Sequence, residues 1–198
     1  MAKLYFKYGV MGSSKTAQAL ITKFNYEEGN NKVLFLKPSI DNRDGFDKVR
    51  SRIGLEATAI VVDSTNSIEN DILLNKCKLK PDVIICDESQ FFTEDQINEL
   101  KNIAYTYDIP VLCFGLLTDF QTHLFSGSKR LIEIADSIQE IKMVCSCGKK
   151  AQINARIIDG KITTSGEQIF IGGNESYKAM CYSCWNRARK ENDKIKTS

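Results

Sequence analysis

The sequence is poor in proline, has one histidine and one tryptophan, and contains no long apolar run. Its longest apolar runs, VIIC (83–86) and VLCFGLL (111–117), have the length of strands, whereas a membrane helix needs about 20 apolar residues. The N-terminus also lacks the apolar stretch and small-residue cleavage site of a secretion signal. We therefore expect a globular protein of the cytoplasm, with no membrane partner.

An excess of charge of either sign is also missing. Lys plus Arg total 27 and Asp plus Glu total 25, which leaves a net charge of +2. The basic C-terminal run is interrupted by Glu191 and Asp193, as in a solvated helix face. Nucleic-acid binders usually carry a basic patch or stripe, so no nucleic-acid partner is expected.

Short apolar runs alternate with longer amphipathic ones from residue 3 to about 143, which is typical of a parallel sheet flanked by helices. The strand candidates are Leu4 to Tyr8, Lys32 to Leu36, Ala59 to Val62, Val83 to Cys86, Val111 to Gly115 and Ile138 to Met143. The helix candidates are Lys15 to Glu28, Ser67 to Asn75, Thr93 to Tyr107 and Lys129 to Asp136. Thr93 supplies a capping hydroxyl, and Glu94 and Asp95 add negative charge at a helix start.

The residue pattern changes after Met143 to short β-branched runs and glycine-containing turns, so a small β-rich module is predicted there. It contains the pairs Cys145-x-Cys147 and Cys181-x-x-Cys184. Because no secretion signal is present, clustered cysteines favour metal over disulfides, and four cysteines without an open position fit a structural Zn²⁺ site. Free thiols are the alternative interpretation of the four cysteines. The other cysteines, Cys77, Cys86 and Cys113, lie in predicted helix or strand runs and are interpreted as core residues.

The segment YFKYGVMGSSKT (5–16) resembles a phosphate-binding loop between a strand and a helix. Lys15-Thr16 follow Gly9 at the spacing of G-x-x-x-x-G-K-[ST], but Ser14 stands where the second glycine is usual. A strand–turn–helix with an incidental Lys-Thr pair would explain the segment about equally well if it stood alone.

The segment VIICDESQFF (83–92) changes that balance. An apolar strand that ends in Asp87-Glu88 after a phosphate loop is the Walker B arrangement, in which Asp87 holds Mg²⁺ and Glu88 lies beside the γ-phosphate. Adjacent carboxylates at a strand end can also form a plain turn. With the loop as a partner, the functional interpretation is the stronger one.

An ordered set of motifs resembles the zinc-containing thymidine kinases of P-loop fold. The segments that carry the resemblance are GVMGSSKT (9–16), FLKPSIDNR (35–43), DESQFF (87–92), FGLLTDFQTHLF (114–125), both cysteine pairs and GEQIFIGGNESY (166–177). The resemblance implies a RecA-like α/β ATP-binding domain over 1–143 and a zinc-held lasso domain with a C-terminal helix over 144–198. It also implies transfer of the γ-phosphate of ATP to the 5′-hydroxyl of thymidine.

The resemblance assigns roles to individual residues. Glu88 matches the general base, Arg43 matches a residue that helps the transferring phosphoryl group, and Asp41 would orient Arg43, although a plain surface ion pair explains Asp41 about equally well. The residues implied for ATP, phosphate and Mg²⁺ are Gly9, Val10, Met11, Gly12, Ser13, Ser14, Lys15, Thr16, Asp87 and Gln90. Those implied for thymidine are Phe91, Leu116, Phe120, Phe125, Phe170, Ile171, Gly172, Gly173 and Tyr177, and those for zinc are Cys145, Cys147, Cys181 and Cys184.

The resemblance further implies a homotetramer and feedback inhibition by dTTP. His123, the single histidine, is expected in a loop near the substrate and not as a catalytic group, and Asn154 stands where a small polar residue often lines the pocket. Two alternatives stay open. One is a nucleic-acid-stimulated P-loop ATPase with a DNA-binding zinc module, and the other is a nucleotide-binding regulator without turnover, suggested by Ser14.

Overall fold

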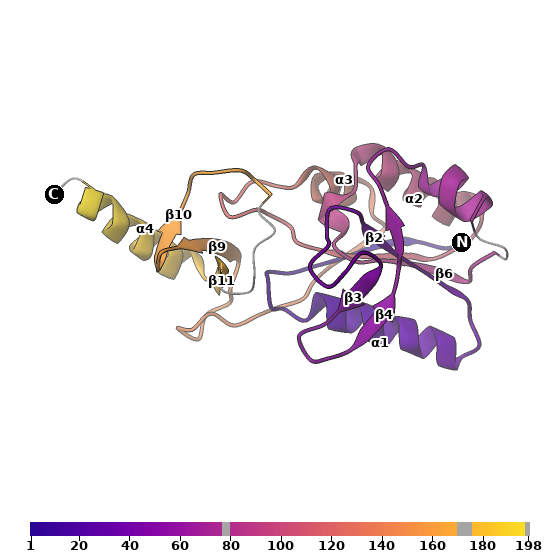
Figure 1. Cartoon of the computed structure of the whole chain (residues 1–198), viewed down its shortest axis with the longest axis horizontal. Helices are drawn as coiled ribbons and strands as arrows, with labels where there is room; N and C mark the ends of the chain where they lie inside the picture. The colour runs from indigo at the N-terminus through magenta and orange to yellow at the C-terminus, as the bar shows by residue number, and fades with distance from the viewer. Residues whose placement is uncertain (77–79, 170–175, 197–198) are drawn as a thin grey trace.

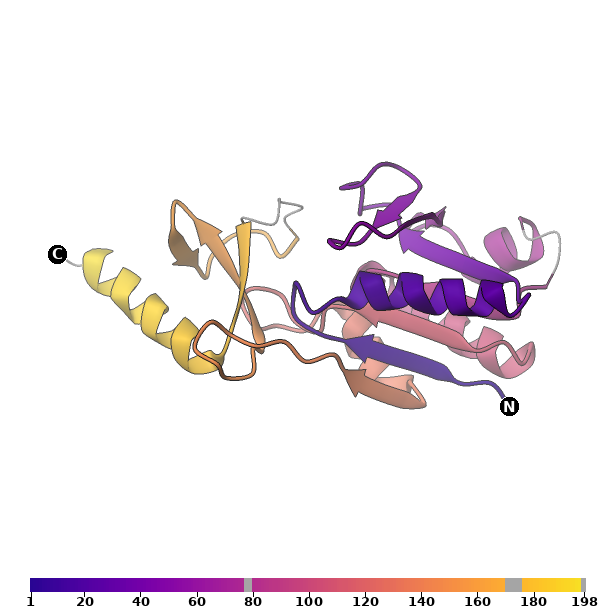
Figure 2. The ribbon, with the colours of Figure 1, turned by 90° about the horizontal axis from the view of Figure 1, so that it is seen from below.

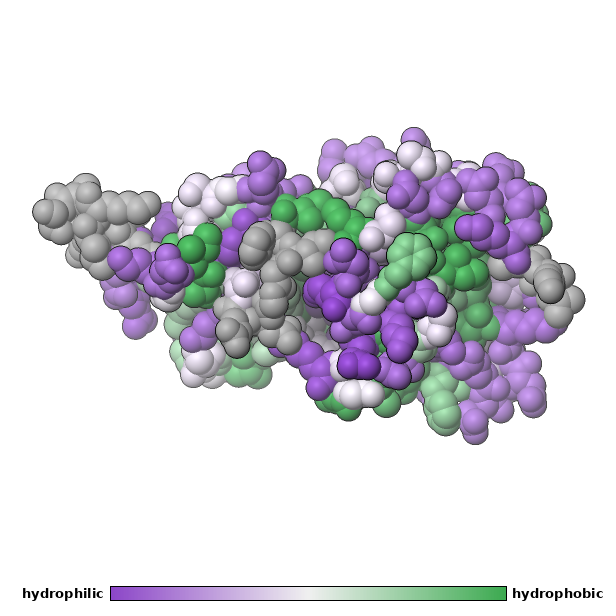
Figure 3. Space-filling view, in the orientation of Figure 1, coloured by the Kyte–Doolittle hydropathy of each residue, from purple (hydrophilic) through white to green (hydrophobic). Residues whose placement is uncertain are grey.

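The computed structural model describes residues 1–76, 80–169 and 176–196. The molecule is elongated, with an α/β part at one end and a smaller β-rich part, which ends in a helix, at the other (Figure 1). No described helix has both the length and the apolarity needed to cross a membrane. Hydrophilic side chains cover much of the face drawn in Figure 3.

A parallel sheet forms the centre of the α/β part. Its strands lie in the order β5-β2-β6-β7-β1-β8, and every neighbouring pair is parallel. The strands are β1 (Leu4–Tyr8), β2 (Val33–Pro38), β5 (Ile60–Val62), β6 (Val83–Cys86), β7 (Val111–Gly115) and β8 (Ser137–Glu140). This confirms the predicted α/β class with a parallel sheet.

Helices cover both faces of the sheet, which explains why β6 is apolar at every position. α1 (Lys15–Glu28) packs on one face (Figure 2), where Val83 and Ile85 are buried. On the other face, Ile84 and Cys86 share a second core with α2 (Glu94–Thr106) and η1 (Ile68–Leu74), and α3 (Ser126–Ile134) adds Leu131. Cys113 is also buried there, as predicted, whereas Cys77 lies outside the described residues.

The start of α2 is fixed by a capping box. The Thr93 hydroxyl accepts a hydrogen bond from the Gln96 amide at 3.1 Å, and the Gln96 side chain accepts one from the Thr93 amide at 3.1 Å. These bonds satisfy amides that have no partner within the helix. The helix start predicted from Thr93 is therefore confirmed.

Some elements differ from the sequence prediction. Several boundaries move by a few residues, and the segment predicted as an ordinary helix near 67–75 is wound as a π-helix, η1. An antiparallel hairpin of β3 (Lys48–Arg50) and β4 (Glu56–Thr58) was not predicted, because its strands are short and mostly polar. This hairpin borders the main cavity.

The smaller part is an antiparallel sheet followed by a helix. Its strands, in the order β10-β9-β11, are β9 (Ile153–Ile158), β10 (Lys161–Thr163) and β11 (Tyr177–Met180), and α4 spans Tyr182–Lys196. Ile153, Met180 and Trp185 form its core together with Cys145. Val10, from the segment after β1, is buried in the same core and ties the phosphate loop to this part.

Candidate active site

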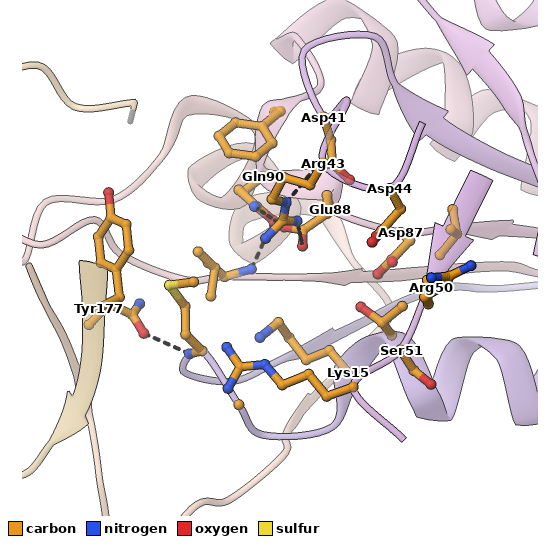
Figure 4. Close-up of a pocket in the computed structure, with 18 of the residues that line it drawn as sticks. Lys15, Asp41, Arg43, Asp44, Arg50, Ser51, Asp87, Glu88, Gln90 and Tyr177 are labelled. Carbon is orange, nitrogen blue, oxygen red and sulfur yellow. Dashed lines mark hydrogen bonds and ion pairs between the residues drawn. The ribbon is translucent and has the colours of Figure 1, made fainter. Parts of the chain in front are cut away.

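A cavity of about 990 Å³ lies where the two parts meet. It is lined by the start of α1, the end of β6, the β3–β4 hairpin and residues of the β-rich part such as Asn154 and Tyr177. Figure 4 shows Lys15, Glu88 and Tyr177 around it. Because parallel strands end at a common edge, this is the place where α/β folds usually bind ligands.

The segment between β1 and α1 has the backbone of a phosphate loop. Gly12 has φ 81° and Ser14 has φ 65°, so both are left-handed, and only glycine adopts this region without strain. A Cβ on Gly9 would lie 2.4 Å from Ser13 Oγ and 2.5 Å from the Ile141 carbonyl oxygen, so no larger residue fits there. Ser14 thus adopts the left-handed conformation that a glycine usually has at this position, so the loop keeps its backbone shape with a serine there.

Lys15 is buried at the first position of α1 and aimed back at its own loop. Its Nζ donates to the Val10 carbonyl oxygen at 2.9 Å. The pKa of Lys15 is lowered to about 8, mainly by burial and also by the charges of Arg43 and Arg52, against the opposing charges of Glu88 and Asp87. Lys15 is therefore still mainly a cation at neutral pH, and an anion bound beside it would stabilise that charge.

Asp87 and Thr16 offer oxygen ligands beside Lys15. The pKa of Asp87 is raised to about 7, first by burial and then by the charge of Glu88, while a hydrogen bond with Thr16 opposes these effects. Carboxylate and hydroxyl oxygens are the ligands that Mg²⁺ takes next to phosphates. A buried carboxylate whose charge is poorly compensated fits a cation site, so the pair suits Mg²⁺.

Glu88 is held at the end of β6 by two donors, in a left-handed conformation with φ 49°. Arg43 Nη2 donates to one carboxylate oxygen at 2.5 Å, and Gln90 Nε2 donates to the other at 2.5 Å. Burial acts to raise the pKa of Glu88, but the charges of Arg43 and Lys15 outweigh it and leave the pKa below its ordinary value. Glu88 is thus an ionised carboxylate with a fixed direction (Figure 4).

Arg43 and Gln90 are themselves oriented. Arg43 Nε donates to Asp41 at 2.6 Å, and Asp41 is buried, which favours the orienting role of Asp41 over a plain surface ion pair. The Gln90 side-chain oxygen accepts from the Leu116 amide at 2.9 Å. Gln90 was predicted among the phosphate residues, and the structure places its amide group between Glu88 and the end of β7.

Aromatic side chains line the far end of the cavity. Phe91 and Phe125 meet edge to face with ring centroids 5.6 Å apart. The Arg156 guanidinium lies 3.7 Å from the Phe120 ring centroid, and its Nη2 donates to the Tyr177 hydroxyl at 2.7 Å. These predicted aromatic residues border the cavity, as does Leu116, so the structure brings them together.

The four paired cysteines form one cluster, with sulfur atoms within 4.8 Å of one another. Backbone amides at Cys147 and Cys181 lower the pKa of Cys145 to about 6, whereas hydrogen bonding to neighbouring sulfurs raises the pKa of Cys184 to about 12. Four crowded sulfurs cannot all be thiolates unless a cation compensates them. Because Zn²⁺ binds four thiolates tetrahedrally, the cluster fits a structural zinc.

Comparison with known proteins places this architecture in one family. A family model described as thymidine kinase matches residues 2–185. The chain is 42% identical to a thymidine kinase of Lactococcus lactis over 182 residues, which cover 91% of this chain and 95% of that protein. It is 43% identical over 183 residues to a thymidine kinase of Enterococcus faecalis, covering 91% and 93%, and 40% identical over 183 residues to one of Rhodopirellula baltica, covering 91% and 86%. The chain belongs to the thymidine kinase family.

Not all residues expected from this thymidine kinase family reach the cavity. Met11, Gly12, Ser14, Lys15 and Thr16 line it, whereas Gly9, Val10 and Ser13 support the loop from behind. His123 is exposed in the loop after β7 and does not line the cavity. The expected thymidine contacts Phe170, Ile171, Gly172 and Gly173 lie outside the described residues.

Two residues of β9 contribute more than the sequence indicated. The Asn154 side chain accepts from the Met11 amide at 2.7 Å and donates to the Thr118 carbonyl at 3.0 Å, so it joins both parts of this family member. Arg156 is buried and also donates to the carbonyl oxygens of Glu167 and Gln168. A single arginine in a short strand looks like a solvated charge, so no local signal marks Arg156.

Proposed function

We propose that the protein transfers the γ-phosphate of ATP to the 5′-hydroxyl of thymidine, giving ADP and dTMP. The observation that carries this proposal is that a single cavity joins a phosphate loop, the Glu88–Arg43 pair and an aromatic wall. Those are the three groups of contacts that a nucleoside kinase needs, for polyphosphate, acceptor hydroxyl and base.

The phosphate end is assigned to the loop, Lys15, Thr16 and Asp87. Loop amides and the start of α1 favour anions, and Lys15 adds a positive charge to the phosphates. Thr16 and Asp87 would hold Mg²⁺, which neutralises charge on the phosphates when bound. Burial strengthens these interactions because little water remains to screen them.

Glu88 is assigned to the acceptor hydroxyl. Its ionised carboxylate orients the 5′-hydroxyl of thymidine and accepts its proton as the oxygen bonds to the γ-phosphorus and the bond to the β-phosphate oxygen breaks. Because phosphoryl transfer has a loose transition state, the proton moves late and positioning matters most. Arg43, oriented by Asp41, supplies charge to the transferring group.

The aromatic wall of Phe91, Phe120, Phe125 and Tyr177 is assigned to the thymine base. Flat rings stack on a pyrimidine, while Leu116 and Met11 border the space beside its 5-methyl group. Such a pocket discriminates by only about 1–3 kcal/mol per methylene, so some 5-substituted uridines should also react. Backbone groups at 170–173 are proposed to meet the Watson–Crick edge of the base.

The remaining proposals follow from the family. They are a domain division at 143/144, assembly into a homotetramer, feedback inhibition by dTTP at the same site, and a cytoplasmic location. The zinc of the cysteine cluster is assigned a structural role because four cysteines leave no position open for substrate.

Transfer of labelled phosphate from ATP to thymidine tests the proposal. We expect dTMP formation by the wild type and a loss in kcat of roughly 100-fold or more for Glu88→Gln, with the KM for ATP changed less than about threefold. Glu133→Gln, an exposed ion-paired glutamate on α3, is the matched control and should behave as wild type. Absence of transfer by the wild type would favour the nucleotide-binding regulator, and hydrolysis that needs DNA would favour the ATPase.

A further inference from the structure

A lysine that the proposed reaction does not use is buried near the end of β2. Lys37 is 1% exposed, whereas residues 41–44, a few positions later, line the cavity. Side chains alternate along a strand, so Lys37 points to the same face of the sheet as Phe35, which is buried in one of the two apolar cores. Because an ammonium group is costly to bury in apolar surroundings, the groups that compensate it are expected to depend on it in turn.

The partners of Lys37 lie on the chain that links β2 to β3, residues 39–47, here called the linking segment. Lys37 Nζ donates to the Lys48 carbonyl oxygen at 2.8 Å and to the Gly45 carbonyl oxygen at 3.3 Å. It also lies 3.9 Å from Asp41 Oδ2. One side chain of the sheet therefore ties down the linking segment near its start and at its end.

Asp41 lies between two cations. Its Oδ2 faces Lys37, and its Oδ1 accepts from Arg43 Nε at 2.6 Å. Arg43 in turn donates to Glu88 (Figure 4), so positive and negative charges alternate from the buried lysine to the Glu88 carboxylate. A buried carboxylate needs its charge compensated, and Lys37 supplies that compensation on the side away from Arg43.

Loss of the lysine ammonium would act on the linking segment twice. Two carbonyl oxygens would lose their donor, and buried Asp41 would keep a cation on one side only. Both changes favour movement of Asp41 toward water, and Arg43, which is bound to it, would move as well.

We propose that Lys37 is a positioning residue for phosphoryl transfer, which acts through Asp41 to hold Arg43 against Glu88. This inference rests on the proposed function, because it is the proposed reaction that uses the pair of Arg43 and Glu88. It adds to that site a buried cation behind the residues that line the cavity.

A double-mutant cycle of Lys37→Met and Arg43→Ala tests the inference. In the wild-type background Lys37→Met should lower kcat roughly 10- to 100-fold, as is common when a group that orients a functional side chain is lost. The KM for thymidine and the Kd for MgATP should change less than about threefold, because the aromatic wall and the phosphate loop keep their own contacts. In the Arg43→Ala background Lys37→Met should lower kcat less than about threefold, because the arginine through which it acts is gone. Lys37→Arg, which keeps a cation and donors, should recover part of the loss.

Gln96→Leu is the matched control for the loss of a buried donor. Gln96 is buried, and its Nε2 also donates to two loop carbonyls, those of Asp63 at 2.8 Å and Asn66 at 3.0 Å, in the loop between β5 and η1. Its loss should destabilise the fold in a similar way and leave kcat within about threefold of wild type.

An equal loss of kcat from Lys37→Met in both backgrounds would overturn the inference, and so would a loss of the same size in Gln96→Leu. Trypsin cleavage after Arg43, followed by mass spectrometry, does not depend on turnover. It should be faster in Lys37→Met than in the wild type or Gln96→Leu, and an unchanged rate would also overturn the inference. If the wild type forms no dTMP, the proposed function fails while the trypsin comparison continues to test Lys37. If Lys37→Met does not fold, Lys37→Gln, which keeps a donor without the charge, takes its place in every comparison.

Discussion

The two parts of the molecule differ in what holds them together. The α/β part buries aliphatic side chains on both faces of its sheet, in two separate cores. The β-rich part has one small core, and two of its buried residues, Cys145 and Cys181, belong to the cysteine cluster. Small modules rarely gain enough from burial alone and are commonly stabilised by a metal.

The two parts also contribute different groups to the candidate active site. The groups assigned to chemistry, Lys15, Asp87 and Glu88, lie on the part with the extensive cores, where their positions are firmly held. The β-rich part adds Tyr177 and Asn154 to the same cavity. We infer that loss of a metal bound at the cluster damages base binding first and leaves the α/β sheet, with Asp87 and Glu88, folded, whereas the phosphate loop loses the contacts of Val10 and Met11 with the β-rich part.

Removal of the metal should have the largest effect. We expect Cys184→Ser, or chelation of the wild type, to unfold the β-rich part and lower dTMP formation by more than about 100-fold, since metal binding and folding are coupled in such modules. Near-complete loss of transfer, with retained helix signal in circular dichroism and a protected α/β fragment in limited proteolysis, is the expected outcome.

Cys113→Ala is the matched control for that experiment. Cys113 is buried in the sheet core and outside the cluster, so its loss should cost about 1 kcal/mol of stability without releasing metal. Full activity of the chelated, metal-free protein would contradict the proposed role of the cluster.

Much of the α/β part could be predicted from the sequence because local and global signals agree there. The run VIIC (83–86) was recognisable as a buried strand from its own composition, and Thr93 with the acidic residues after it marked the start of α2. The cysteine pairs likewise indicated a cluster from spacing alone, and the cluster has formed. In each case the residue types have one dominant structural use.

The rest depends on contacts between distant segments. The strands of the β3–β4 hairpin are short and mostly polar, so Arg52 could not be placed near Gly12 from the sequence. The π-helical winding of η1 has no pattern of its own in the sequence. Asn154 was recognised as a polar pocket residue, but its bonds to Met11 and Thr118 require the β-rich part to be placed against the loop.

The link between the two parts can be broken at Asn154. Asn154→Ala leaves the Met11 amide and the Thr118 carbonyl without these partners, at a cost of about 1–3 kcal/mol for a buried polar group. We expect the KM for thymidine to rise about tenfold and the KM for ATP to rise less than about threefold, measured by steady-state kinetics. Asn154→Asp keeps the acceptor for the Met11 amide, so its KM for thymidine should lie between those of the wild type and Asn154→Ala. Equal effects of Asn154→Ala on the KM for thymidine and the KM for ATP would show that the hydrogen bond to Met11 serves the phosphate loop itself.

The smallest effect is expected at Ser14. Ser14→Gly relieves a left-handed serine, which costs about 1 kcal/mol, but glycine loses about 0.5–1 kcal/mol more conformational entropy on folding. Since these terms nearly cancel, we expect the free energy of unfolding to change by less than about 0.5 kcal/mol and the KM for ATP by less than about threefold. Asn30→Gly is the control, because Asn30 is also left-handed, with φ 57°, and lies on the surface away from the cavity. A large change in kcat for Ser14→Gly, with none for Asn30→Gly, would show that the serine hydroxyl takes part in catalysis and that the loop depends on more than its backbone.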